Sequence, residues 1–304
     1  MSVPEPVLLA EMPSLSKLYV NAAAMAARRR LLGDHAGTEL PGSAHEVRGV
    51  RAGVENLTAY QHLIGETASD ILPAGFLHAL AFPLSMSVMN RDDFPLPLLG
   101  MIHLNNSVVQ SAPVLFTEAL DIRAWAENLR GHRSGTQLDL VAEVRGAGED
   151  LVRWRGVSTY LAKAVFLPGI DKPSVAAAPG PFTAPDPTAL WQLGVDTGRA
   201  YASVSGDFNP IHLSVLSAKA LGLRRSIAHG MYLASRALAD VGAAKGEAFR
   251  WEVAFDAPVF LPARVALDIS TVQGEDGAWR GSEYVAWSPH AGRKHFSGSV
   301  SPLK

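Results

Sequence analysis

The sequence predicts an α+β fold in which two long apolar helices are each followed by antiparallel strands. Residues 75–89 and 230–241 are apolar nearly all round, so both segments should form buried helices. Apolar and polar residues alternate along 137–144 and 265–270, which is the pattern of strands that turn one face toward a core. A buried helix followed by such strands indicates a helix covered by a curved sheet.

The segments before and inside the first buried helix add three expectations. The Ala-rich stretch 14–30 favours a helix that is too short and too interrupted by charge to span a bilayer. Pro4 and Glu5 stand where a signal peptide needs basic and then apolar residues, so none is expected. Pro83 should kink the first buried helix, because its ring lacks the N–H that the helix needs.

The chain also shows a weak internal repeat. Three segments of the first half match the second half in the same order: 60–66 with 201–207, 72–76 with 227–231, and 112–114 with 257–259. Each match is weak by itself, but the shared order indicates an ancient duplication.

A proline-rich stretch separates the two halves. Prolines at 168, 173, 179, 181, 185 and 187 exclude a helix or an inner strand there. We therefore expect an N-terminal domain at 1–167, which includes a non-repeated extension, a linker at 168–188, and a C-terminal domain at 189–304.

Composition excludes several classes of function. The 304 residues are 48% apolar and 18% charged with a formal net charge of −2, so neither nucleic acid nor an anionic membrane is an expected partner. The chain has no cysteine, which rules out a thiol nucleophile, a zinc–thiolate site and an iron–sulfur cluster. We expect a cytoplasmic protein without a bound metal.

The chemistry is predicted to lie in the segment 201–231, YASVSGDFNPIHLSVLSAKALGLRRSIAHGM. Pro210 forces a turn between Asp207 and His212, and such a turn can aim a carboxylate and an imidazole at one water for acid–base work. Gly230 opens a buried helix, whose first N–H groups stabilise a developing oxyanion. The short string alone also fits a turn-capping Asp207 and a surface His212.

The longer pattern resembles the hydratase signature of the MaoC-like, (R)-specific enoyl-CoA hydratase family. That signature has an aromatic residue, then S/G-G-D-x-N-P-I/L-H, a spaced A/S and a later I-A-H-G-M. Here the matching positions are Tyr201, 205–212, Ala218 and 227–231. The segments 100–114 and 123–135 also resemble double-hotdog (3R)-hydroxyacyl-thioester dehydratases of mycobacterial type.

The resemblance implies a double hotdog, with two units that each wrap a long helix in an antiparallel sheet. It also implies reversible hydration of trans-2-enoyl thioesters to (3R)-3-hydroxyacyl thioesters in fatty-acid metabolism, with Asp207 and His212 catalytic and Gly230 holding the enolate oxygen. The first half carries Glu66 but has Ile71 where a histidine would fall, so it is expected to be catalytically dead.

Supporting roles follow from the same pattern. Asn209 is expected at the substrate site, more as the residue that holds the turn than as a substrate contact. Ser235 should hydrogen-bond the catalytic pair or serve as a core serine. Arg224 and Arg225 are candidates for cofactor phosphates, while His229, beside a buried helix start, should be a packing residue.

Two other functions and several partners remain open at this point. A hotdog thioesterase would bind the same acyl thioester and attack its carbonyl, and a non-catalytic acyl-thioester-binding subunit would perform no reaction. No separate cofactor is expected, because the substrate is carried on coenzyme A or on acyl carrier protein. Two hotdogs in one chain form a pseudo-dimer, so both a monomer and a homodimer fit.

Overall fold

Both long apolar helices predicted from the sequence are present. They are α3 (Ala74–Met89) and α7 (Gly230–Val241). The Ala-rich N-terminal stretch forms α1 (Leu15–Leu32), as predicted. The alternating segments form part of β5 (Gly135–Gly146) and of β9 (Ala263–Gln273). α3 continues past Pro83 to its last residue, and the kink expected there stays a prediction.

The chain divides into two compact units. The computed structural model describes residues 4–32, 37–173 and 180–303. Unit 1 contains the segments Met1–Arg51, His78–Asn106 and Thr117–Ala178. Unit 2 contains the segments Ala52–Leu77, Ser107–Phe116 and Pro179–Lys304. The division into domains predicted from the linker stays a prediction.

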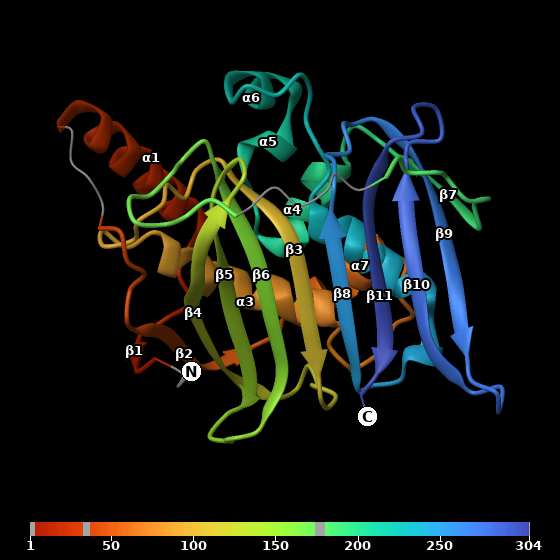
Figure 1. Ribbon diagram of the computed structural model, residues 1–304. Coiled ribbons are helices and arrows are strands. Elements are labelled where there is room, and N and C mark those ends of the chain that lie inside the picture. The colour runs from red at the N-terminus through yellow and green to blue at the C-terminus, as the bar shows by residue number, and fades with distance from the viewer. Residues whose placement is uncertain (1–3, 33–36, 174–179, 304) are drawn as a thin grey trace. The chain divides into compact units, whose positions relative to one another are not determined.

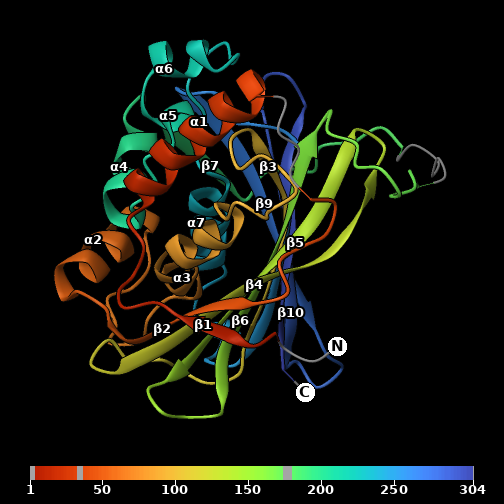
Figure 2. The same ribbon diagram turned by 90° about the vertical axis from the view of Figure 1, so that its left-hand side faces the viewer.

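Unit 1 is a sheet with a helix on one face. Its strands are β1 (Pro6–Leu8), β2 (Ala44–Arg51), β4 (Ala119–His132), β5 and β6 (Val152–Lys163), in the order β1-β2-β4-β5-β6. The β1–β2 pair is parallel and the others are antiparallel. The first part of β3 (Met101–Gln110) adjoins β6. Figures 1 and 2 show α3 against one face of β4, β5 and β6.

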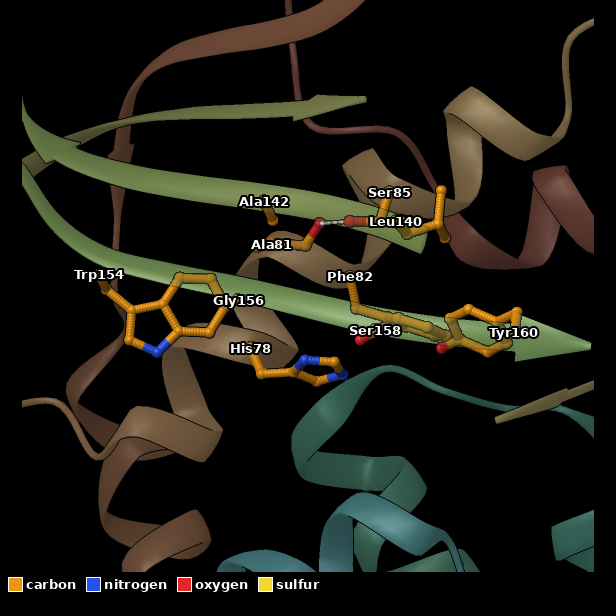
Figure 3. Close-up of a pocket in the computed structure, with 10 residues that line it drawn as sticks. All are labelled: His78, Ala81, Phe82, Ser85, Leu140, Ala142, Trp154, Gly156, Ser158 and Tyr160. Atoms are coloured by element: carbon orange, nitrogen blue, oxygen red, sulfur yellow. Dashed lines mark hydrogen bonds between the residues drawn. The ribbon is translucent and has the colours of Figure 1, made fainter. Parts of the chain in front are cut away.

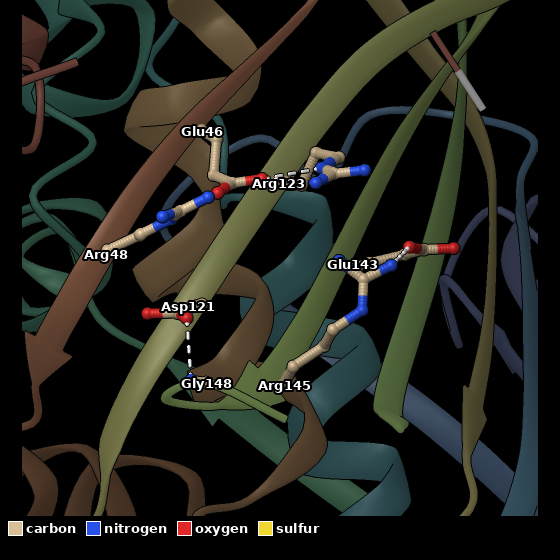
Figure 4. Close-up of polar contacts among 7 residues, drawn as sticks. All are labelled: Glu46, Arg48, Asp121, Arg123, Glu143, Arg145 and Gly148. Atoms are coloured by element: carbon tan, nitrogen blue, oxygen red, sulfur yellow. Dashed lines mark hydrogen bonds and ion pairs between the residues drawn. The ribbon is translucent and has the colours of Figure 1, made fainter. Parts of the chain in front are cut away.

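The opposite face of the unit 1 sheet carries charge that is largely covered. The carboxylate of Glu46, whose side chain is 5% exposed, accepts hydrogen bonds from Arg48 and Arg123. Glu143 pairs with Arg145 on the next row, as Figure 4 shows. Aliphatic stems of arginines cover apolar sheet surface while their guanidinium groups stay paired, so this face needs no helix to shield it.

Unit 2 holds the second sheet and most of the short helices. Its strands are β7 (Ala189–Leu193), β8 (Phe249–Phe255), β9, β10 (Trp279–Trp287) and β11 (Lys294–Pro302), antiparallel in the order β8-β11-β10-β9-β7. Its helices are α2 (Val54–Ile64), α4 (Thr197–Ser205), α5 (Pro210–Leu213), α6 (Val215–Ala220), α7 and the 3₁₀ turn η1 (Ala243–Lys245). α7 lies along one face of β8, β11 and β10 (Figure 1).

The proline-rich stretch behaves as its composition indicates. Of the predicted linker 168–188, residues 174–179 lie outside the described part, and the remainder contains neither helix nor strand. Among the described residues, no helix combines the length and apolar character that a membrane crossing requires.

Candidate active site

The loop that carries Asp207 is shaped by its own sequence. Gly206 ends α4 with φ of 74°, a left-handed conformation in which glycine has no steric penalty. The Asn209 side chain then caps α5 by accepting from the Ile211 N–H at 3.3 Å, with Pro210 at the first helical position. Asp207 Oδ1 accepts from the Asn209 N–H at 3.2 Å. Asn209 therefore holds the turn, as expected.

His212 is held in one tautomer. It is 8% exposed, and its Nδ1 lies 2.8 Å from the carbonyl oxygen of Ile227. Because a carbonyl can only accept, Nδ1 carries the proton and Nε2 of the neutral ring is left as an acceptor. Burial lowers the pKa of His212, and the nearby Asp207 carboxylate only partly offsets this. The ring is therefore a neutral base at physiological pH.

His229 contacts both members of the predicted pair. Its Nε2 donates to the main-chain oxygen of Asp207 at 3.0 Å and lies 3.7 Å from Asp207 Oδ2. Its ring stacks on that of His212, with centroids 3.6 Å apart and planes 24° apart. Burial, and then repulsion from His212, lower the pKa of His229. Its burial agrees with a packing residue, but its contacts place it within the site.

The three side chains can hold a water molecule. One carboxylate oxygen of Asp207 and one ring nitrogen each of His212 and His229 lie within 4.8 Å of one another. Two acceptors that each hold one hydrogen of the same water lie about 4.5 Å apart, given ordinary hydrogen bonds of ~2.8 Å. The spacing therefore suits a water oriented by both of its hydrogens.

The same three residues are less suited to a metal ion. One carboxylate and two imidazoles are common metal ligands. Each imidazole, however, already uses one nitrogen on a main-chain carbonyl, and the stacked rings direct their remaining lone pairs along nearly parallel planes. Those lone pairs do not converge on one point, so the arrangement favours acid–base chemistry.

Gly230 begins α7 beside this cluster. As the first residue of the helix, its N–H takes no part in the internal hydrogen bonds of the helix. A Cβ at this position would lie 3.0 Å from the ring of Phe255, so the close approach of β8 favours glycine. The N–H at the positive end of the helix is available to an oxyanion.

Ser235 pairs with a residue that sequence reasoning missed. Its Oγ accepts from the Tyr60 hydroxyl at 2.9 Å, and its side chain is buried. This agrees with the expected core serine, and the structure gives Ser235 no hydrogen bond to Asp207 or His212 among the described residues. Tyr60 also lies against Tyr201, with centroids 6.1 Å apart. These two tyrosines match in the internal repeat, which was the available signal.

The remaining predicted residues lie at the surface. Arg224 and Arg225 are both exposed, and the guanidinium of Arg224 lies 4.2 Å from the ring centroid of Phe260. In the first-half counterpart of the motif, Glu66 is paired with Lys245 at 3.1 Å. An ion-paired carboxylate is neutralised, in agreement with a site that has lost its function. Sequence reasoning missed Lys245, because it lies far away along the chain.

Comparison with known proteins identifies the chain. A family model described as the MaoC-like domain matches residues 178–288. The 3-hydroxyacyl-thioester dehydratase X of Mycobacterium tuberculosis is 37% identical over 242 residues, which cover 79% of this chain and 84% of that protein. The crystal structure of HtdX from the same organism superposes with a TM-score of 0.72 at 32% identity, covering 86% of this chain and all of that one.

A more distant structure shows the fold. A conserved hypothetical protein of Mycobacterium tuberculosis with a double hotdog fold superposes with a TM-score of 0.54 at 14% identity, covering 84% of this chain and 93% of that chain. The expected double hotdog is thus confirmed, and fold and site together define a MaoC-like double-hotdog protein. The chain belongs to the family of MaoC-like 3-hydroxyacyl-thioester dehydratases.

Proposed function

We propose that this protein catalyses the reversible hydration of trans-2-enoyl thioesters to (3R)-3-hydroxyacyl thioesters in fatty-acid metabolism. The observation that carries the proposal is the Asp207–His212 pair, held by its own turn in a chain that belongs to a dehydratase family. The reaction needs a base for water, an acid for the α-carbon and a site for an enolate oxygen.

In the hydration direction, Asp207 and His212 hold one water over the β-carbon. Each accepts one hydrogen of the water, which leaves an oxygen lone pair directed at the substrate. As the C–O bond forms, one group of the pair takes a proton and a proton returns to the α-carbon on the same face. The negative charge that develops on the thioester oxygen is stabilised by the Gly230 N–H.

The substrate handle is also part of the proposal. Coenzyme A needs no additional cofactor, and Arg224 and Arg225 are exposed cations suited to its phosphates. An acyl carrier protein is the alternative carrier. The cytoplasmic location and a monomeric or homodimeric state stay predictions.

The direct test follows the enoyl-thioester absorbance with trans-2-enoyl-CoA substrates of increasing length, and then determines the configuration of the product. The proposal predicts turnover to the (R)-3-hydroxyacyl product. Release of free thiol would instead indicate the thioesterase. Absence of turnover with both coenzyme A and carrier-protein substrates would indicate a non-catalytic binding subunit.

The acid side of the pH profile tests the state of His212. Burial lowers the pKa of His212, so the neutral base persists to lower pH than for an ordinary histidine. We therefore expect kcat/KM to fall on the acid side only below pH 6.5, the ordinary value. In Asp207→Asn, an NMR titration of the His212 ring should give a lower pKa still, because the carboxylate that raises it is gone. A higher pKa in that variant would contradict this electrostatic account.

His229 should act as a positioning residue for Asp207. The His229→Phe variant keeps a ring against His212 but loses the N–H that holds the Asp207 main chain. We expect kcat to fall roughly tenfold with little change in KM, the size of one lost buried hydrogen bond. The His229→Gln variant retains a side-chain N–H and should recover part of the loss. Equal activity of both variants would indicate a purely space-filling residue.

A further inference from the structure

A second cavity lies within unit 1, between α3 and the strands β5 and β6. Figure 3 shows its walls: side chains of α3 on one side and inward-facing residues of the two strands on the other. The lining residues are His78, Ala81, Phe82, Ser85, Leu140, Ala142, Trp154, Gly156, Ser158 and Tyr160. In this conformation the enclosed space is about enough for one water molecule, or for one oxygen atom of a ligand.

The cavity wall contains a hydrogen-bond donor without an acceptor. The Trp154 side chain is 1% exposed, and its indole Nε1 has no hydrogen-bond partner among the described residues. Its ring folds over Gly156, where any side chain would collide with it. Leaving such a donor unpaired costs about 1–3 kcal/mol, so its retention needs a compensating acceptor.

The polar neighbours do not supply that acceptor. The Ser158 hydroxyl donates to Asn106 Oδ1 at 2.9 Å, and the Ser85 hydroxyl donates to the Ala81 carbonyl of its own helix at 3.3 Å. The amide nitrogen of Asn106 is a second buried donor without a partner among the described residues. This end of unit 1 therefore has an excess of donors.

The walls are apolar and uncharged. None of the residues that line the cavity is Asp, Glu, Lys or Arg. Beside the cavity, His103 stacks between His78 and Tyr160, and burial lowers the pKa of His103 to about 3, which keeps that ring neutral. An ionised ligand group would be buried without a counter-charge, at high cost. The fitting ligand carries a neutral acceptor on an apolar skeleton.

We propose that this cavity receives a keto or hydroxyl oxygen carried on the apolar acyl chain of the substrate, with the Trp154 N–H as its donor. The inference rests on the proposed function for the acyl thioester and adds the substrate class. The preferred substrates are enoyl thioesters with a further oxygen on the chain beyond the double bond.

The test measures binding rather than turnover. Isothermal calorimetry on the Asp207→Asn protein compares trans-2-decenoyl-CoA with derivatives that carry one keto group, moved along the chain beyond the double bond. We expect one keto position to bind about tenfold more tightly than the plain chain, the worth of one hydrogen bond to a buried donor. Trp154→Phe should abolish that preference. The control Trp279→Phe, whose indole donates to Ser282 in unit 2, should retain it.

A spectroscopic measurement covers the case in which Trp154→Phe fails to fold. The chain has six tryptophans, so the indole N–H signals of the otherwise unmodified protein can be followed individually by NMR. The Trp154 signal should shift with the keto ligand and stay in place with the plain one. Equal affinities at every keto position, with an unmoved Trp154 signal, would mean that the donor serves a buried water only and would overturn the proposal. Loss of turnover in the unmodified protein would count against the proposed reaction and leave this binding comparison valid.

Discussion

Replacing Asp207 by asparagine should lower kcat for enoyl-thioester hydration by roughly 100-fold or more, the usual worth of a positioned acid or base. Asparagine keeps the size of the side chain, and its Oδ1 can still accept from the Asn209 N–H that closes the turn. What it loses is the ability to take or return a proton. Circular dichroism and thermal unfolding should therefore match those of the unmodified protein.

The chain offers a matched control for this change. Glu66 stands at the repeat position that corresponds to Asp207, and it pairs with Lys245. Glu66→Gln removes a carboxylate from the equivalent turn of the first half, so turnover should stay within about twofold, because a partly exposed ion pair contributes little. If Glu66→Gln lost as much activity as Asp207→Asn, the assignment of a single catalytic half would be wrong.

The second large effect should come from His212→Asn. The asparagine amide can still donate to the Ile227 carbonyl, as Nδ1 of the imidazole does, but nothing replaces the acceptor at Nε2. We expect a loss in kcat of roughly 100-fold or more with the fold preserved. Steady-state kinetics and the unfolding midpoint measure the two parts separately.

His212→Ala provides the comparison. It removes the acceptor and also leaves the buried Ile227 carbonyl without its donor, so stability should fall by about 1–3 kcal/mol. Because Asp207 and His212 act on one water, the double variant with both asparagines should be scarcely slower than either single variant. Losses that multiply in the double variant would show that the two groups act independently.

The sequence predicted the features of this fold that depend on local pattern. α3 and α7 could be predicted because nearly continuous apolar surface has to be buried. The turn of Asp207 and Asn209 could be predicted because glycine, asparagine and proline each restrict the backbone where they stand.

Long-range pairs could not be predicted in the same way. The bond from Tyr60 to Ser235 and the pairing of Lys245 with Glu66 join segments far apart in the chain, and nothing in either segment names its partner. The contact of His229 with the main chain of Asp207 was missed for a related reason, because a histidine before a helix looks the same whether it packs or positions.

The buried charges of unit 1 show a further limit of pattern reading. Glu46 and Glu143 fall on the polar side of alternating strands, where solvent exposure is the ordinary expectation. Both are buried because arginines from their own or neighbouring strands cover and pair with them. Only the assembled sheet brings those arginines together.

The measurement that tests the central claim most directly is hydration of crotonyl-CoA in deuterium oxide, with the configuration of the product determined at both new centres. Asp207 and His212 act from one side of the substrate, so the account predicts a (3R)-hydroxyl group with deuterium added to the α-carbon on the same face. Addition to opposite faces, or a product of S configuration, would contradict the proposal that this one pair performs both proton transfers.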